Sequence, residues 1–149
     1  MPSIDTSVLI QAPLDRVYAI AKDNRSFPEF MDDVKSLNVI LEDGPRVVSE
    51  WVGIIPTFNL KIRWTQEDVW DDSAHTCKFV QLKGDYDSME GTWEFSAEGP
   101  ETTRFTSHVE YEYNVPALGA LVRKVIFNLA TKNVEGLLNA IKNRAESGS

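Results

Sequence analysis

Six segments between residues 34 and 115 alternate apolar and polar side chains, and only short turn sequences such as "EDGP" and "DDSAH" separate most of them. A period of two residues is that of a β-strand with one buried and one solvent-exposed face. Strands joined by short turns pair with their neighbours in sequence, so this run predicts a six-stranded antiparallel meander. The predicted strands are 34–43, 46–55, 58–70, 76–82, 92–98 and 103–115.

Segments on either side of the meander complete the predicted fold. Residues 3–10 alternate as a seventh strand, and two short helices are expected at 13–22 and 26–32 because Pro28 interrupts the helical pattern. Residues 117–145 repeat apolar side chains at helical spacing and predict one long helix. Since seven twisted strands cannot stay flat, we expect an α+β fold whose curled sheet wraps around the long helix and leaves an internal cavity.

The 149-residue chain carries a formal net charge of −8, which disfavours nucleic acid as a partner because phosphate recognition needs a basic face. Its length suits one domain over residues 1–149, with 145–149 as a frayed tail. The chain contains no apolar stretch long enough to predict stable membrane insertion. A single cysteine and an N-terminus without a signal-peptide pattern favour a cytoplasmic location.

The sequence "GDYDSMEG" at 84–91 allows two interpretations. Its acidic residues could bind a metal, but their spacing does not fit a calcium loop, and the two histidines are too far apart for a chain-local zinc site. Strand patterns on both sides favour a bend at Gly84 and Asp85, with Met89, Gly91 and Trp93 on the inner face. We therefore expect no metal site.

The order of these segments resembles the START-like (SRPBCC) superfamily, and within it the bacterial polyketide cyclase/dehydrase-like and coenzyme Q-binding proteins. The matching pieces are "IQAPLDRVYAIAKDNRSFPEFM", "SEWVGI", "KIRWTQEDVWDD", "GDYDSMEGTWEF", "TRFTSHVEYEYNVP" and "LVRKVIFNLATKNVEGLLNAI", which together cover nearly the whole chain. The resemblance implies the helix-grip fold and a cavity for a hydrophobic small molecule, with neither a metal nor a bound cofactor required.

Aromatic residues on the predicted strands favour a mostly apolar pocket with a few polar groups, because buried Tyr and Trp need partners for their polar atoms. Tyr111 and Tyr113 are also candidates for a catalytic acid. Phe27, Phe30 and Met31 are expected either to gate the cavity or to fix the second short helix to the core. The residues expected to line the cavity are Trp51, Phe58, Trp64, Met89, Trp93, Phe105, Tyr111, Tyr113, Leu121 and Phe127. Further polar candidates on strands are Asn59, Arg63, Gln66, Gln81 and Ser107.

Three functions remain open at this point. The chain could bind or transport a hydrophobic small molecule, such as a lipid, a quinone or a polyketide-like aromatic. It could be a polyketide aromatase/cyclase that acts in the same cavity. It could also be a protein-interaction module that uses the long helix or the acidic surface. The sequence identifies neither the ligand nor the oligomeric state.

Overall fold

The structure is a computed structural model that describes residues 2–55, 60–113 and 120–147. A strand comes first, two helices and a 3₁₀ turn follow, and six consecutive strands lead to a long final helix. The elements are β1 (Ser3–Ile10), α1 (Leu14–Lys22), η1 (Asn24–Ser26), α2 (Phe27–Phe30), β2 (Val34–Asp43), β3 (Arg46–Ile55), β4 (Leu60–Asp71), β5 (Thr76–Gly84), β6 (Ser88–Gly99), β7 (Thr102–Glu112) and α3 (Ala120–Glu146).

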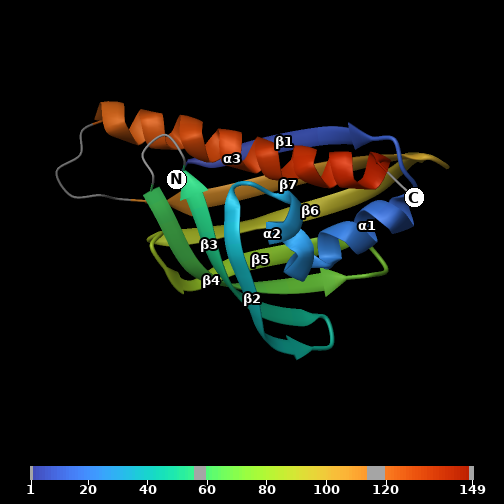
Figure 1. The fold of residues 1–149 in the computed structure, drawn as a ribbon, viewed down its shortest axis with the longest axis horizontal. Helices are drawn as coiled ribbons and strands as arrows, with labels where there is room; N and C mark the ends of the chain where they lie inside the picture. Colours follow the sequence, from blue (N-terminus) through green and yellow to red (C-terminus); the bar gives the residue numbers. More distant parts are fainter. Residues whose placement is uncertain (1, 56–59, 114–119, 148–149) are drawn as a thin grey trace.

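All seven strands form one antiparallel sheet in the order β1-β7-β6-β5-β4-β3-β2. Each strand of the meander pairs with the next one in sequence, and β1 joins at the far edge against β7, with Ser3 opposite Glu110. The helix α3 runs along the sheet beside β1 (Figure 1). The predicted α+β helix-grip fold, with its curled seven-stranded sheet, is confirmed.

The helices follow the sequence signals with small differences at their ends. The first helix begins directly after Pro13 and places Asp15 in its first turn and Lys22 in its last, the favourable arrangement for the helix dipole. The second predicted helix, 26–32, is shorter in the structure, because Met31 has an extended backbone and β2 follows closely. Residues 117–119 of the predicted long helix lie outside the described residues.

The predicted frayed tail is partly ordered. Ala145 is buried in the core and Glu146 is the last residue of α3. A carboxylate oxygen of Glu146 accepts hydrogen bonds from the Gln11 backbone N–H at 2.8 Å and from the Lys142 ammonium at 2.6 Å. These contacts fasten the end of the helix to the segment that follows β1.

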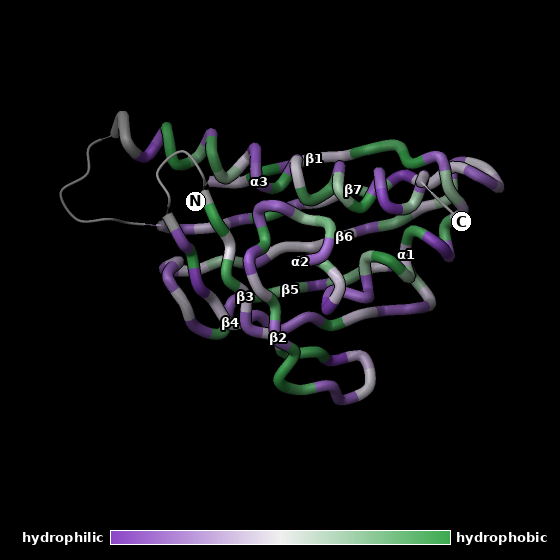
Figure 2. The backbone as a smooth tube through the Cα atoms, viewed as in Figure 1, coloured by the Kyte–Doolittle hydropathy of each residue, from purple (hydrophilic) through white to green (hydrophobic). Residues whose placement is uncertain are grey.

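Hydrophobic and hydrophilic residues alternate along the strands (Figure 2), and the inner-face residues form two buried clusters. The larger cluster packs α1 and the end of α3 against the sheet through Ile10, Val17, Phe105, Leu138 and Ile141, among others. The smaller cluster consists of Ile4, Phe79, Met89 and Tyr111. Among residues 2–55, 60–113 and 120–147, no helix has both the length and the apolar character needed to cross a membrane.

Candidate functional site

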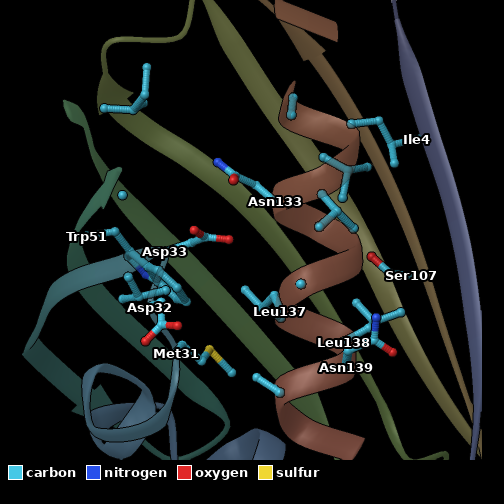
Figure 3. Close-up of a pocket in the computed structure, with 18 of the residues that line it drawn as sticks. Ile4, Met31, Asp32, Asp33, Trp51, Ser107, Asn133, Leu137, Leu138 and Asn139 are labelled. Carbon is cyan, nitrogen blue, oxygen red and sulfur yellow. The ribbon is translucent and has the colours of Figure 1, made fainter. Parts of the chain in front are cut away.

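A cavity of about 690 Å³ lies between the concave face of the sheet and α3. Its wall includes residues of β1, of strands β3 to β7, of the segment from α2 into β2, and of α3 (Figure 3). Every residue of the smaller buried cluster contributes to this wall. The volume falls within the range of pockets that enclose drug-sized molecules.

One side of the wall is an aromatic surface. Trp51 on β3 lies opposite Trp64 on β4, and their rings stack with centroids 5.5 Å apart and planes 13° apart. On β5 and β6, the rings of Phe79 and Trp93 meet edge to face with centroids 6.1 Å apart. The pairing of neighbouring strands therefore brings four aromatic residues to one cavity.

The polar atoms of the two stacked indoles already have protein partners. The Trp51 indole N–H donates to the Ser49 hydroxyl at 2.8 Å, and the Trp64 indole N–H donates to the Gln66 side-chain oxygen at 2.9 Å. The Gln66 amide in turn donates to the Asp68 carboxylate at 2.7 Å. Because both N–H groups are occupied within the wall, the indole rings present apolar surface to the cavity.

Asp68 ends this network behind the wall and is 3% exposed. Its second carboxylate oxygen accepts a hydrogen bond from Asn24 at 3.3 Å. Burial raises the pKa of Asp68 to about 6, although the hydrogen bond from Gln66 acts in the opposite direction. The network thus ends in a carboxyl group that titrates in mildly acidic solution.

Three tyrosines surround another part of the cavity. The ring of Tyr86 meets the rings of Tyr111 and Tyr113 edge to face, with centroids 5.9 Å and 5.8 Å apart. Burial raises the pKa of Tyr111 and, together with the two neighbouring tyrosines, that of Tyr86. The phenols of Tyr86 and Tyr111 therefore stay protonated in neutral solution and can donate hydrogen bonds to a molecule in the cavity.

Charged residues reach the wall from the segment that links α2 to β2 and from the C-terminal part of α3. Asp32 and Asp33 come from the first, and Figure 3 shows the Asp33 carboxylate in the space between Trp51 and α3. Burial, with a contribution from Asp32, raises the pKa of Asp33. Arg144 comes from α3, and its guanidinium lies 4.9 Å from the centre of the Phe30 ring.

The family model for polyketide cyclase/dehydrase and lipid transport proteins matches residues 10–138. The chain belongs to this family. The match spans most of the sheet, the aromatic wall and α3 as far as Leu138. The resemblance of the sequence to polyketide cyclase/dehydrase-like proteins is therefore confirmed.

Solved structures with the same fold agree with this membership. A protein of Thermus thermophilus is 38% identical, with 97% of each chain covered and a TM-score of 0.91. The Zhui aromatase/cyclase of a Streptomyces species is 17% identical, with 97% of this chain and 93% of that chain covered and a TM-score of 0.88. A START superfamily protein of Mycobacterium smegmatis is 17% identical, with 97% of each chain covered and a TM-score of 0.80. The two less identical structures share the fold alone. No curated protein matches the chain.

Several residues selected from the sequence line the cavity of this family member. Leu121 lies in α3, but its side chain, like the whole of Phe58, falls outside what the structure describes. Of the polar strand residues, Gln66 and Ser107 belong to the wall. The selected residues that the structure brings to the wall are Phe30, Met31, Trp51, Trp64, Met89, Trp93, Tyr111 and Tyr113.

Three selected phenylalanines lie elsewhere. Phe105 is fully buried and stacks on Phe95 with centroids 4.4 Å apart, so it fills the core and is not part of the wall. Phe27 is fully buried against Phe30 and Trp51 and fixes the short helix to the core rather than gating the cavity. Phe127 packs against the smaller cluster, and its neighbour Ile126 lines the cavity in its place.

The stretch "GDYDSMEG" forms a bend, as expected, but its second glycine makes room for a different aromatic ring of the wall. Gly84 adopts φ +153°, and the Asp85 carboxylate accepts a hydrogen bond from the Arg63 backbone N–H at 2.8 Å, which fixes the bend. At Gly91, a Cβ would lie 2.6 Å from the ring of Phe79, so this glycine makes room for Phe79 rather than for Trp93. Within the described segments, no three His, Cys, Asp or Glu residues are grouped to hold a metal ion.

Sequence reasoning missed Phe79, Tyr86, Asp32 and Asp33 as wall residues. Phe79 has the strand period and lies opposite Gly91, so the pairing of an aromatic residue with a glycine could have identified it. Tyr86 lies in the bend between β5 and β6, where no period indicates which way a side chain points. The two aspartates follow α2 and carry no periodic signal either.

Proposed function

We propose that this protein binds and carries a hydrophobic small molecule that contains flat rings, in the cavity between the sheet and α3. The stacked pair of Trp51 and Trp64 is the observation that carries this proposal. Stacked or edge-to-face contacts between rings add about 0.5–1.5 kcal/mol to the gain from apolar burial. A wall of this kind therefore favours a flat ring system, as in a quinone or a polyketide-like aromatic, over a flexible chain.

The expected affinity follows from the surface that the cavity can cover. Burying about 300 Å² of apolar ligand surface contributes roughly 7 kcal/mol at 25 cal/mol per Å². Part of this gain offsets the translational and rotational freedom that the ligand loses. Dissociation constants for small ring systems are therefore expected in the micromolar range or weaker, and concentrations in the binding assay should span it.

Displacement of the fluorescent probe N-phenyl-1-naphthylamine tests the proposal. We expect anthracene to displace the probe more strongly than dodecane, which lacks rings. Trp64→Leu should weaken the binding of anthracene several-fold and leave the binding of dodecane nearly unchanged. Leu82→Ala, at a residue that is 51% exposed, should change neither affinity. Absence of probe binding, together with native mass spectra of freshly purified protein that show no bound molecule, would contradict the proposal.

A polyketide aromatase/cyclase activity in the same cavity is the second candidate, and the three tyrosines favour it. A phenol of Tyr111 could donate a proton to a ketone oxygen while a ring closes. A phenol whose pKa is raised by burial is, however, a poor general acid near neutral pH, because efficient acids have a pKa close to the working pH. We therefore propose the carrier function ahead of the cyclase activity.

Incubation with a linear poly-β-ketone thioester separates the two functions. An enzyme would increase the amount of cyclised product above that of the protein-free control, as measured by mass spectrometry. Tyr111→Phe would then reduce this product strongly while probe binding stays the same. Equal product with and without protein would exclude this cyclase activity and leave the carrier function standing.

A further inference from the structure

The hydroxyl of Ser107 is a buried polar group that faces the cavity without a partner. Ser107 lies on β7 and belongs to the wall, and Figure 3 shows its oxygen directed from the strand towards α3. Its exposed fraction is 0%, and among the described residues no group forms a hydrogen bond with its Oγ. Leaving such a hydroxyl unsatisfied costs about 1–3 kcal/mol.

Other buried hydroxyls of the sheet are satisfied by the protein itself. Thr103 lies on the same strand and the same face as Ser107 and is equally buried, and its hydroxyl donates to the Ala12 carbonyl at 2.8 Å. Ser49 accepts the indole N–H of Trp51. Two further buried side-chain atoms lack a described partner, on Trp70 and Gln81, but neither residue lines the cavity. Ser107 is thus distinguished by its position on the wall.

The surroundings of Ser107 favour an uncharged partner. Trp93 lies opposite it on β6, Thr6 lies opposite it on β1, and Phe105 and Val109 flank it on the same face of β7. The charged residues of the described wall, Asp32, Asp33 and Arg144, belong to other elements. An anionic group at Ser107 would lose its hydration without gaining a cation, which is far more costly than burying a neutral group.

Counting donors and acceptors selects a carbonyl oxygen over a hydroxyl. A single ligand hydroxyl that donates to Ser107 leaves the serine proton without an acceptor. If the ligand hydroxyl accepts that proton instead, its own proton still needs a second acceptor, which Trp93, Phe105 and Val109 do not offer. A carbonyl oxygen accepts the serine proton and brings no donor of its own.

We propose that Ser107 is a specificity-determining residue that donates a hydrogen bond to an uncharged carbonyl oxygen of the ring-containing ligand. This assignment rests on the proposed carrier function and narrows its ligand to ketones or quinones with the carbonyl at the β7 side of the cavity. The aromatic wall then holds the rings, and Ser107 sets their orientation.

A matched pair of probes isolates this hydrogen bond. Fluorene and 9-fluorenone share the same ring skeleton and differ at one carbon, which is CH₂ in the first and C=O in the second. Each is titrated against the bound N-phenyl-1-naphthylamine probe. We expect the wild type to prefer fluorenone, and Ser107→Ala to reduce that preference roughly three- to tenfold, as loss of one neutral hydrogen bond predicts. Affinity for fluorene should change less than twofold.

Control variants distinguish the hydroxyl from general effects. Ser107→Thr keeps a hydroxyl and should retain the preference for fluorenone. Ser96→Ala makes the same chemical change at an exposed position of β6 and should leave both affinities unchanged. If the ratio of fluorenone to fluorene affinity is the same in the wild type and in Ser107→Ala, the role of Ser107 is refuted while the carrier function stands. If neither compound nor the fluorescent probe binds, both proposals fail.

Stability of the ligand-free protein provides a second measurement. If Ser107 has no partner until a ligand arrives, Ser107→Ala should unfold at an equal or higher urea concentration than the wild type. Thr103→Ala removes a hydroxyl that is already bonded and should unfold at a lower one. Equal losses in the two variants would show that Ser107 already has a structural partner, and would overturn its assignment to the ligand.

Discussion

The inner face of β6 and β7 is solid at one end and hollow at the other. At the solid end, Phe95 and Phe105 stack against each other, and Phe105 belongs to the same packed cluster as Ile141 of α3. At the hollow end, Met89 and Tyr111 lie directly opposite each other in the same two strands and face the cavity. The strands have the same alternation throughout, so the difference comes from what covers them.

Two helices cover the solid end, whereas the cavity wall contains residues of α3 and none of α1. The packed end secures the curvature of the sheet, and the hollow end uses that curvature to enclose space. Stability and binding should therefore respond differently to substitutions at the two ends, even where the residues replaced are of similar size and share one strand face.

Truncation at the solid end should have the largest effect. Phe105→Ala removes a fully buried ring from a packed cluster and should lower the free energy of unfolding by about 3–5 kcal/mol. Tyr86→Ala at the hollow end, where the side chain is half-buried, should cost about 1–2 kcal/mol. Urea unfolding of both variants measures the contrast, and equal losses would contradict the division into two ends.

The pH dependence of stability should show the next largest effect, through Asp68 behind the aromatic wall. Its pKa is about 6 in the folded protein against an ordinary value of 3.8, so folding favours the protonated carboxyl. Its contribution to stability is complete below about pH 4 and is lost as the pH rises through about 6, by up to about 3 kcal/mol. Asp68→Asn should remove most of this change in the free energy of unfolding, as measured by urea unfolding at successive pH values. If the free energy of unfolding depends on pH in the same way in both proteins, the Asp68 carboxyl does not titrate in this pH range.

Filling the space beside Phe79 should have an intermediate effect. Gly91→Ala places a methyl group against the Phe79 ring and the backbone oxygen of His108, so the ring or the strand must shift. Overpacking of this kind costs about 1–3 kcal/mol. The shifted ring should also alter probe affinity, because Phe79 lines the cavity. Gly99→Ala, where a Cβ meets nothing closer than 4.0 Å, serves as the control for urea unfolding and should have little effect.

The smallest effect on stability is expected where the cavity itself is filled. Ala130 of α3 lines the cavity, so Ala130→Phe can place its ring in empty space and should change the free energy of unfolding by less than about 1 kcal/mol. Binding of N-phenyl-1-naphthylamine should nevertheless fall by tenfold or more. Ala145→Phe places the same ring in the packed cluster and should show the reverse pattern, with a loss of about 1–3 kcal/mol. Similar stability losses for the two variants would mean that the hollow end is filled.

The comparison also shows how far sequence reasoning extends. Alternation predicted the strands and the inner face, because burial on one face of a sheet imposes a period of two. It could not separate Phe105 from Tyr111, since both share that face and only the helices that cover the face decide which one borders open space. Tyr86 and Asp33 were not predicted as wall residues for another reason. Both lie between regular elements, where no period links residue number to direction.

The position of β1 at the edge of the sheet bears on how the chain acquires its fold during synthesis. β1 leaves the ribosome first, but its partner β7 is made about a hundred residues later, with Ser3 finally opposite Glu110. At about 5–20 residues per second, β1 waits roughly 5–20 s for that partner. The strands β2 to β7 can pair in the order in which they are made. We therefore expect ribosome-bound chains that end before β7 to carry β1 as an exposed segment available to chaperones.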